Sequence, residues 1–155
     1  YKHHERSIQA LKLLGKGSLV IMGAGPKKDE LIQLAKTLDL SDRVKFIQVP
    51  FNDISAYYRS VDLFVLPSWD RESFGIVYLE AMASGIPVVA PNDLSRKEIV
   101  QDAGILVDVS NIEKYTEAVI EALNKSWRNL PRQQAEKFSW DKIAEQYENL
   151  FKEMF

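Results

Sequence analysis

Cysteine is absent from the sequence, and histidine occurs only twice. The lack of cysteine excludes disulfide bonds, thiolate metal sites and a cysteine nucleophile, and it weakly favours a reducing compartment. Long apolar runs are also missing, so no segment has the length that a bilayer-crossing helix needs. We therefore expect a cytoplasmic protein, with peripheral attachment to a membrane left open as an alternative.

A strong charge of one sign is missing as well, because the formal net charge is −2 over 155 residues. No basic stripe with interleaved aromatic residues is present, which argues against a nucleic-acid partner. The length and the hydrophobic share of 46% are typical of one globular domain, covering residues 1–155. The adjacent His3 and His4 lack a third ligand at helical spacing, so we expect an exposed pair and no metal site.

Short apolar runs alternate along the chain with segments of helical periodicity. Continuous apolar strands separated by helices are typical of a parallel sheet that is covered on both faces. The sequence therefore predicts an α/β fold, a Rossmann-like doubly wound parallel sheet with helices on both faces. The predicted strands are 19–22, 44–49, 63–66, 88–90 and 105–107, and the predicted helices are 8–15, 31–38, 54–59, 74–84, 97–100, 112–123 and 140–155.

Turn-forming residues follow several of the predicted strands. Gly23 and Gly25 come directly after the first strand, and Val49 ends the second. Ligands of such sheets bind beyond the carboxyl ends of the strands, so we expect these residues to border a binding site. The two glycines also suggest a dinucleotide-dependent oxidoreductase, but Lys28 stands where the third glycine of that motif belongs.

The most specific pattern is a pair of glutamates, Glu72 and Glu80, on either side of a predicted helix start. The main-chain N–H groups of Phe74, Gly75 and Ile76 are expected to be unpaired there, where the helix dipole favours an anion. A carboxylate accepts hydrogen bonds from two neighbouring hydroxyls. An anion between two diols describes a nucleotide-diphosphate sugar, which the sequence thus predicts as the ligand.

Each glutamate also has a simpler explanation when it is taken alone. An acid before a helix, such as Glu72, is common because the helix dipole favours it. Glu80 stands among apolar residues, where a carboxylate is costly unless it finds a partner. Glu72 and Glu80 with Gly75 between them therefore indicate a ligand site more specifically than either glutamate alone.

From Ser18 to the C-terminus, the order and spacing of these segments resemble the C-terminal domain of a GT-B glycosyltransferase, most closely the retaining family 4 (group 1) enzymes. Those enzymes transfer a sugar from a UDP-, GDP- or ADP-sugar with retention of configuration. The resemblance implies a nucleotide-sugar substrate, no cofactor, and an acceptor that is a glycan, a lipid or a small molecule. The segments that carry it are 19–26, 42–46, 58–68, 72–90 and 138–140.

The resemblance also implies roles for single residues. Glu72 matches the catalytic-site glutamate that holds hydroxyls of the transferred sugar, and Glu80 matches the glutamate that binds the nucleotide ribose. Lys2 falls at the position of a lysine that neutralises the diphosphate, although an exposed terminal lysine explains it equally well. The chain differs from the family at Gln48, at Ser73 and at 93–95, where glycine is common.

One element of the family fold is not found in the sequence. The first strand of that fold lies in the middle of the sheet, and here the chain starts with the helix that follows it. Omitting the strand would leave backbone groups unpaired inside the domain. We therefore expect a fragment of a two-domain protein, inactive alone, whose N-terminal domain binds the acceptor. The aromatic residues Trp140, Tyr147, Phe151 and Phe155 are expected to contact that domain or to pack locally on the sheet.

A retaining glycosyltransferase of carbohydrate or cell-envelope biosynthesis is therefore the leading functional hypothesis. The alternative is a non-catalytic module that binds nucleotide-sugar, or a degenerate subunit of a larger enzyme. Measured transfer, as opposed to binding alone, separates these two.

Overall fold

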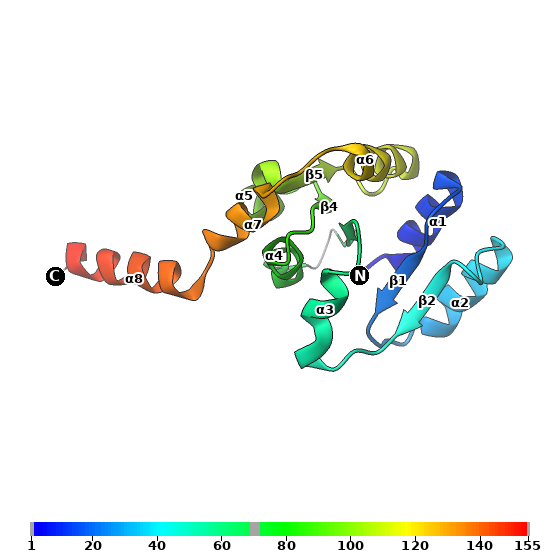
Figure 1. Ribbon diagram of the computed structural model, residues 1–155, viewed down its shortest axis with the longest axis horizontal. Coiled ribbons are helices and arrows are strands. Elements are labelled where there is room, and N and C mark those ends of the chain that lie inside the picture. The colour runs from blue at the N-terminus through cyan, green and yellow to red at the C-terminus, as the bar shows by residue number, and fades with distance from the viewer. Residues whose placement is uncertain (1, 69–71, 155) are drawn as a thin grey trace.

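The computed structural model describes residues 2–68 and 72–154. Helices lie on both sides of short parallel strands (Figure 1). The strands are β1 (Leu19–Met22), β2 (Val44–Ile47), β3 (Phe64–Val65), β4 (Val88–Pro91) and β5 (Gly104–Val107). The helices are α1 (His4–Leu14), α2 (Lys28–Thr37), α3 (Ile54–Tyr58), α4 (Ile76–Ala83), α5 (Leu94–Val100), α6 (Ile112–Asn124), α7 (Leu130–Glu136) and α8 (Trp140–Met154), with short 3-10 turns η1 (Phe51–Asp53) and η2 (Gln101–Ala103).

The strands form two parallel ladders. In one ladder β1 pairs with β2, and in the other β4 lies between β3 and β5. Within residues 2–68 and 72–154, β1 and β3 thus each pair along one edge only. The predicted α/β class with parallel strands and helices on both faces is confirmed, but the single predicted sheet is divided into two.

Strand β4 shows why its sequence is apolar without alternation. All four of its residues are buried. Val88 and Ala90 pack in a cluster with residues of α4, α5 and α7, whereas Val89 packs on the other face with residues of α6 and with Ala10 of α1. A strand covered on both faces buries every side chain, which stabilises it through the apolar area removed from water.

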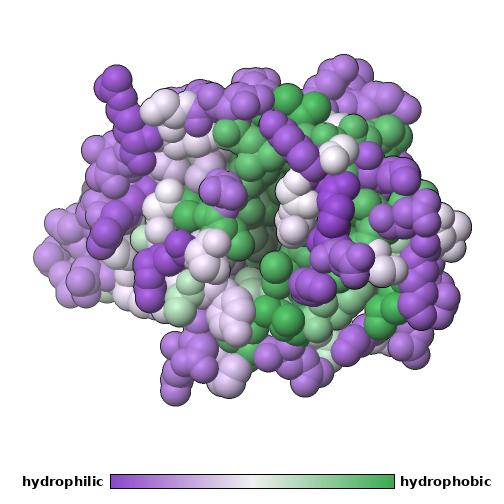
Figure 2. All heavy atoms as spheres, turned by 45° about the vertical axis from the view of Figure 1, so that its right-hand side comes forward, coloured by the Kyte–Doolittle hydropathy of each residue, from purple (hydrophilic) through white to green (hydrophobic). Residues whose placement is uncertain are grey.

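The ladder of β1 and β2 has its own core. Ile8 and Leu11 of α1 pack there with Leu31 and other residues of α2, while Ala10 of the same helix packs against α6. Helix α1 is therefore shared by the two ladders. Figure 2 shows a deep hollow on one face of the molecule, lined by hydrophobic residues and flanked by more polar surface.

Several element boundaries differ from the prediction. Strand β3 is shorter than predicted, and helix α5 begins earlier because the Asp93 carboxylate caps it by accepting a hydrogen bond from Arg96 N at 3.0 Å. Helix α7 was not predicted at all. Its polar sequence lacks an apolar stripe, yet Pro131 lies in its first turn, where the missing N–H costs nothing.

Helix α8 projects away from the body of the protein (Figure 1), and none of its described residues is buried. Trp140 is 83% exposed and Tyr147 is 59% exposed. The alternative that these aromatic residues pack on the sheet is therefore wrong; Phe155 lies outside the described residues.

In the described part of the chain, no helix combines the length and the apolar character needed to cross a membrane.

The prediction of an exposed histidine pair is also wrong. His3 and His4 are partly buried, and His3 Nδ1 lies 3.0 Å from the Glu5 carboxylate. Burial lowers the pKa of His4, so its imidazole stays neutral over more of the physiological range than an exposed histidine. The reason for the error is that α1 begins at His4 and packs against the rest of the fold, which the sequence of the first turn does not reveal.

Candidate functional site

Gly75 sets the geometry of the helix start that the sequence singles out. It caps α4 with φ 78°, in the left-handed region that glycine adopts without strain. A Cβ at this position would lie 2.8 Å from two atoms of the Tyr78 ring. That ring cannot move easily, since Tyr78 is completely buried and its hydroxyl donates to Leu66 O at 2.7 Å. Glycine is therefore required both by the backbone angle and by the neighbouring ring.

The main-chain N–H groups around this glycine are open to a ligand. Among the described residues, no acceptor is found for the N–H groups of Phe74, Gly75 and Ile76. The side chains of Phe74 and Ile76 are 48% and 55% exposed, so the helix start is at the surface. Phe74 leans on Phe138, with ring centroids 6.2 Å apart in an edge-to-face arrangement. Unpaired amides at a helix N-terminus are a common binding site for phosphate groups.

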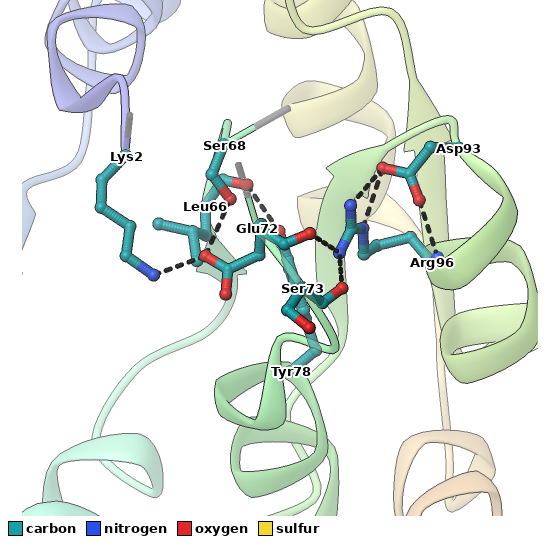
Figure 3. Close-up of polar contacts among 8 residues, drawn as sticks. All are labelled: Lys2, Leu66, Ser68, Glu72, Ser73, Tyr78, Asp93 and Arg96. Carbon is teal, nitrogen blue, oxygen red and sulfur yellow. Dashed lines mark hydrogen bonds and ion pairs between the residues drawn. The ribbon is translucent and has the colours of Figure 1, made fainter. Parts of the chain in front are cut away.

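Glu72 lies beside this helix start, and its carboxylate is held by one ammonium group and one hydroxyl (Figure 3). Its carboxylate accepts a hydrogen bond from Lys2 Nζ at 2.5 Å and one from Ser68 Oγ at 3.3 Å. The side chain of Glu72 is 13% exposed and that of Lys2 is 34% exposed. The structure therefore brings together Lys2 and Glu72, which are far apart in the sequence. The ammonium group of Lys2 lies on the Glu72 carboxylate, next to the segment that leads into α4.

Arg96 completes the site, although its role was not predicted from the sequence. Its guanidinium donates to the main-chain oxygens of Glu72 at 3.1 Å and Ser73 at 2.9 Å, and to the Asp93 carboxylate at 2.6 and 2.9 Å (Figure 3). Its side chain is only 3% exposed. The available signal was the spacing of Asp93 and Arg96, three residues apart after a predicted strand, but nothing in the sequence shows that this pair reaches the Glu72 segment.

Glu80 has the partner that its apolar surroundings demand. Its carboxylate accepts a hydrogen bond from the Tyr58 hydroxyl at 3.1 Å, and Tyr58 is 4% exposed. Burial, together with the nearby Glu80 carboxylate, raises the pKa of Tyr58 well above its usual range. The hydroxyl therefore stays protonated and keeps donating to Glu80. This hydrogen bond uses one of about four acceptor positions on the carboxylate. Glu80 can therefore still accept hydrogen bonds from a diol.

The remaining predicted site residues, Gly23, Gly25 and Val49, lie beyond the carboxyl ends of β1 and β2. Gly23 follows β1, has φ 125° and donates its N–H to Ile47 O at 2.9 Å, while Gly25 accepts from Lys28 N at 3.2 Å. Val49 lies two residues beyond the end of β2 and is partly buried. In the part of the chain that the structure describes, no hydrogen bond or ion pair joins these three residues to Glu72 or Glu80.

This arrangement can bind an anion and hydroxyl groups without metal ligands. The described residues contain no group of three or more histidine, aspartate and glutamate side chains placed to hold a metal ion. The unpaired amides and Lys2 suit a phosphate group, and the two carboxylates suit hydroxyls on either side of it. Residues 69–71, which precede Glu72 in the sequence, lie outside the described residues.

Known proteins resemble this chain in sequence. The sequence profile of the family described as glycosyl transferases group 1 matches residues 1–139. The O-antigen chain mannosyltransferase B of Escherichia coli is 33% identical over 141 residues, which are 86% of this chain and 37% of that protein. A GDP-mannose-dependent alpha-(1-6)-phosphatidylinositol monomannoside mannosyltransferase of Mycobacterium tuberculosis is 36% identical over 68% of this chain and 30% of its own length.

Solved structures resemble it in fold as well. Anabaena HepE, solved in complex with UDP, matches 99% of this chain and 46% of its own chain with a TM-score of 0.86 and 26% identity. Sucrose-phosphate synthase from Thermosynechococcus elongatus matches 99% of this chain and 42% of its own, with a TM-score of 0.84 and 26% identity. The chain thus spans less than half the length of these relatives. It belongs to the group 1 glycosyltransferases and has the α/β architecture of their GT-B fold.

Proposed function

We propose that this chain is the donor-binding domain of a retaining glycosyltransferase. The observation that carries the proposal is the open amide cluster at Gly75, with Glu72 and Lys2 beside it, in a member of the group 1 family. The diphosphate of the donor would accept hydrogen bonds from these amides. Glu72 would then hold hydroxyls of the sugar, and Glu80 would hold the ribose.

The chemistry that this geometry supports is stabilisation of a leaving group. When the bond between sugar and diphosphate breaks, negative charge develops on the diphosphate oxygens. Amides fixed at the helix start, together with Lys2, would stabilise that charge more in the transition state than in the ground state. Glu72 would orient the sugar toward an acceptor hydroxyl. The sugar would be transferred with retention of its configuration.

The donor we propose is a UDP-, GDP- or ADP-sugar. Two relatives differ in their nucleotide, because one is named for GDP-mannose and the other was solved with UDP. The acceptor would be a glycan, a lipid or a small molecule.

We further propose that the active protein contains an N-terminal domain and an additional strand. Among the described residues, each ladder is open at both edges, and the open edges of β1 and β3 are the ones that a strand between the two ladders would join. The hydrophobic hollow of Figure 2 is consistent with a place for such a strand. The N-terminal domain would bind the acceptor, and the exposed aromatic face of α8 would be available to contact it.

A panel of ligands tests the proposed function. We expect UDP, GDP or ADP, or the matching nucleotide-sugar, to raise the melting temperature of the protein, because a ligand that binds the folded state stabilises it. NAD serves as the control for the oxidoreductase alternative and should have no effect. Transfer of labelled sugar by the full-length protein then separates an enzyme from a non-catalytic binding module. The proposal is wrong if no nucleoside diphosphate or nucleotide-sugar shifts the transition.

Glu80→Ala should weaken nucleoside diphosphate binding by roughly tenfold, since hydrogen bonds to a charged group are worth about 1.5–3 kcal/mol. Inorganic pyrophosphate, which lacks the ribose, should bind the variant and the wild type equally. Calorimetric titration with both ligands measures the difference. Glu117→Ala, which removes an exposed carboxylate from α6, is the matched control. Equal loss of both ligands would show that Glu80 does not contact the ribose.

A further inference from the structure

Arg96 is a buried cation whose hydrogen bonds converge on two neighbouring peptide groups. Its Nη1 donates to the carbonyl oxygens of both Glu72 and Ser73, while Nε and Nη2 donate to Asp93 Oδ2. A buried guanidinium is costly unless its charge is paired and its donors are used. Asp93 supplies the paired charge, and the two carbonyls take up the remaining side of the planar fork.

The two carbonyls determine where the adjoining N–H groups point. In a trans peptide the C=O and the N–H of the same group point in opposite directions, and the described residues contain no cis peptide bond. The carbonyl of Glu72 shares its peptide group with the N–H of Ser73, and that of Ser73 shares its group with the N–H of Phe74. With both oxygens held by Arg96, both N–H groups are turned away from it. A cationic donor on the oxygen also polarises the peptide group, which strengthens the N–H as a donor.

We propose that Arg96 is a positioning residue that aims and polarises the Phe74 amide of the anion site and adds the neighbouring Ser73 amide to that site. The inference rests on the proposed function, because it assigns to those amides the diphosphate of the donor. Arg96 itself lies on the opposite side of the peptide groups and does not touch the ligand. Asp93 in turn fixes Arg96, and it accepts from Arg96 N at the start of α5, so the clamp is anchored in a helix cap.

A merely structural role for Arg96 makes a different prediction. If Arg96 only joins α5 to the Glu72 segment, its loss lowers the free energy of unfolding. Ligand affinity then falls only as far as that loss of stability explains. If it positions the amides, ligand affinity falls more than stability explains. Lysine keeps the charge but has a single ammonium group, which cannot bridge Asp93 and two carbonyls in one plane. Arg96→Lys therefore separates the presence of a positive charge from the geometry of the fork.

The test compares Arg96→Lys with Tyr115→Phe in calorimetric titrations with inorganic pyrophosphate, UDP and GDP. Tyr115→Phe removes a buried hydrogen bond to Ser7 Oγ at 3.2 Å, in which residues 72–76 take no part, and controls for lost stability. We expect Arg96→Lys to weaken the binding of pyrophosphate and of nucleoside diphosphates by roughly tenfold, which is the effect of losing one charge-assisted hydrogen bond. Tyr115→Phe should bind all three like the wild type.

A spectroscopic measurement tests the same point without a ligand. The ¹⁵N and ¹H resonances of the Ser73 and Phe74 amides report hydrogen bonding at the carbonyl of the same peptide group. Both should move upfield in Arg96→Lys and stay in place in Tyr115→Phe. If Arg96→Lys does not fold, Asp93→Asn replaces it, since this change loosens the guanidinium without touching the amides and should produce a smaller loss of the same kind.

The outcomes are distinguishable. If the wild-type protein binds neither pyrophosphate nor any nucleoside diphosphate, the proposed function is wrong and the role of Arg96 is overturned with it. If the wild type binds but Arg96→Lys binds equally well, or Asp93→Asn does where Arg96→Lys does not fold, only the role of Arg96 is overturned. Unchanged resonances of Ser73 and Phe74 would overturn it as well. Weaker binding with shifted resonances, beside an unchanged Tyr115→Phe control, supports the inference.

Discussion

Glu72→Gln should lower the rate of sugar transfer by the full-length enzyme by roughly 10²- to 10³-fold, the usual effect of removing one group that acts in the transition state. The substitution keeps the size of the side chain. It replaces a carboxylate, which accepts from two hydroxyls, with an amide that offers one acceptor and two donors. The sugar would then be bound in the wrong orientation, while the diphosphate would keep its amides.

Two measurements check this expectation. Initial rates with labelled donor report transfer, and calorimetry with UDP or GDP reports diphosphate binding, which should stay within about twofold of the wild type because no proposed diphosphate contact is lost. Glu117→Gln, an equivalent change on the exposed surface of α6, should leave both unchanged. Transfer at the wild-type rate by Glu72→Gln would rule out the proposed role of this carboxylate.

Gly75→Ala should destabilise the protein and abolish diphosphate binding. The new Cβ would lie 2.8 Å from Tyr78 ring atoms that are fully buried, and the residue would have to keep φ near 78°. Left-handed backbone costs alanine about 1–2 kcal/mol, and overpacking adds about 1–3 kcal/mol. We therefore expect the free energy of unfolding to fall by about 2–5 kcal/mol, measured by chemical denaturation.

The other end of the same helix provides the matched control. Gly85 follows α4 with φ 85°, and a Cβ there meets no atom within 4 Å. Gly85→Ala should therefore cost only the backbone contribution of about 1–2 kcal/mol and should leave UDP or GDP binding intact. Equal destabilisation by the two substitutions, or diphosphate binding by Gly75→Ala at wild-type strength, would contradict the account of Gly75.

Much of the fold follows from local sequence patterns. The apolar run at 88–90 predicted a strand buried on both faces, and β4 shows that burial. Glycine after an amphipathic segment predicted the end of α1 at Gly15, whose φ is 73°. Helix α7 was missed because its stability comes from packing against α4 and the η2 turn rather than from a periodic apolar face. Packing partners of that kind are not encoded within the segment itself.

The same distinction applies to the site. Glu72, Gly75 and Glu80 are close in sequence, so their relation could be predicted from the chemistry of a helix start. The contacts of Glu72 with Lys2, of Glu80 with Tyr58, and of Arg96 with the Glu72 segment join different elements. Such contacts depend on how the elements pack, and no spacing rule predicts them. The part of the site that sequence reasoning missed is therefore the part that holds the predicted residues in place.

Helix α1 packs against both ladders, and Lys2 lies just before its first turn with its ammonium group on Glu72. Glu72, in contrast, belongs to the segment that runs from β3 to α4. The ion pair therefore joins the start of α1 to the segment before α4. If the proposed donor draws Lys2 toward its phosphates, the Lys2–Glu72 pair is weakened, so donor binding and the strength of this pair are thermodynamically linked in both directions.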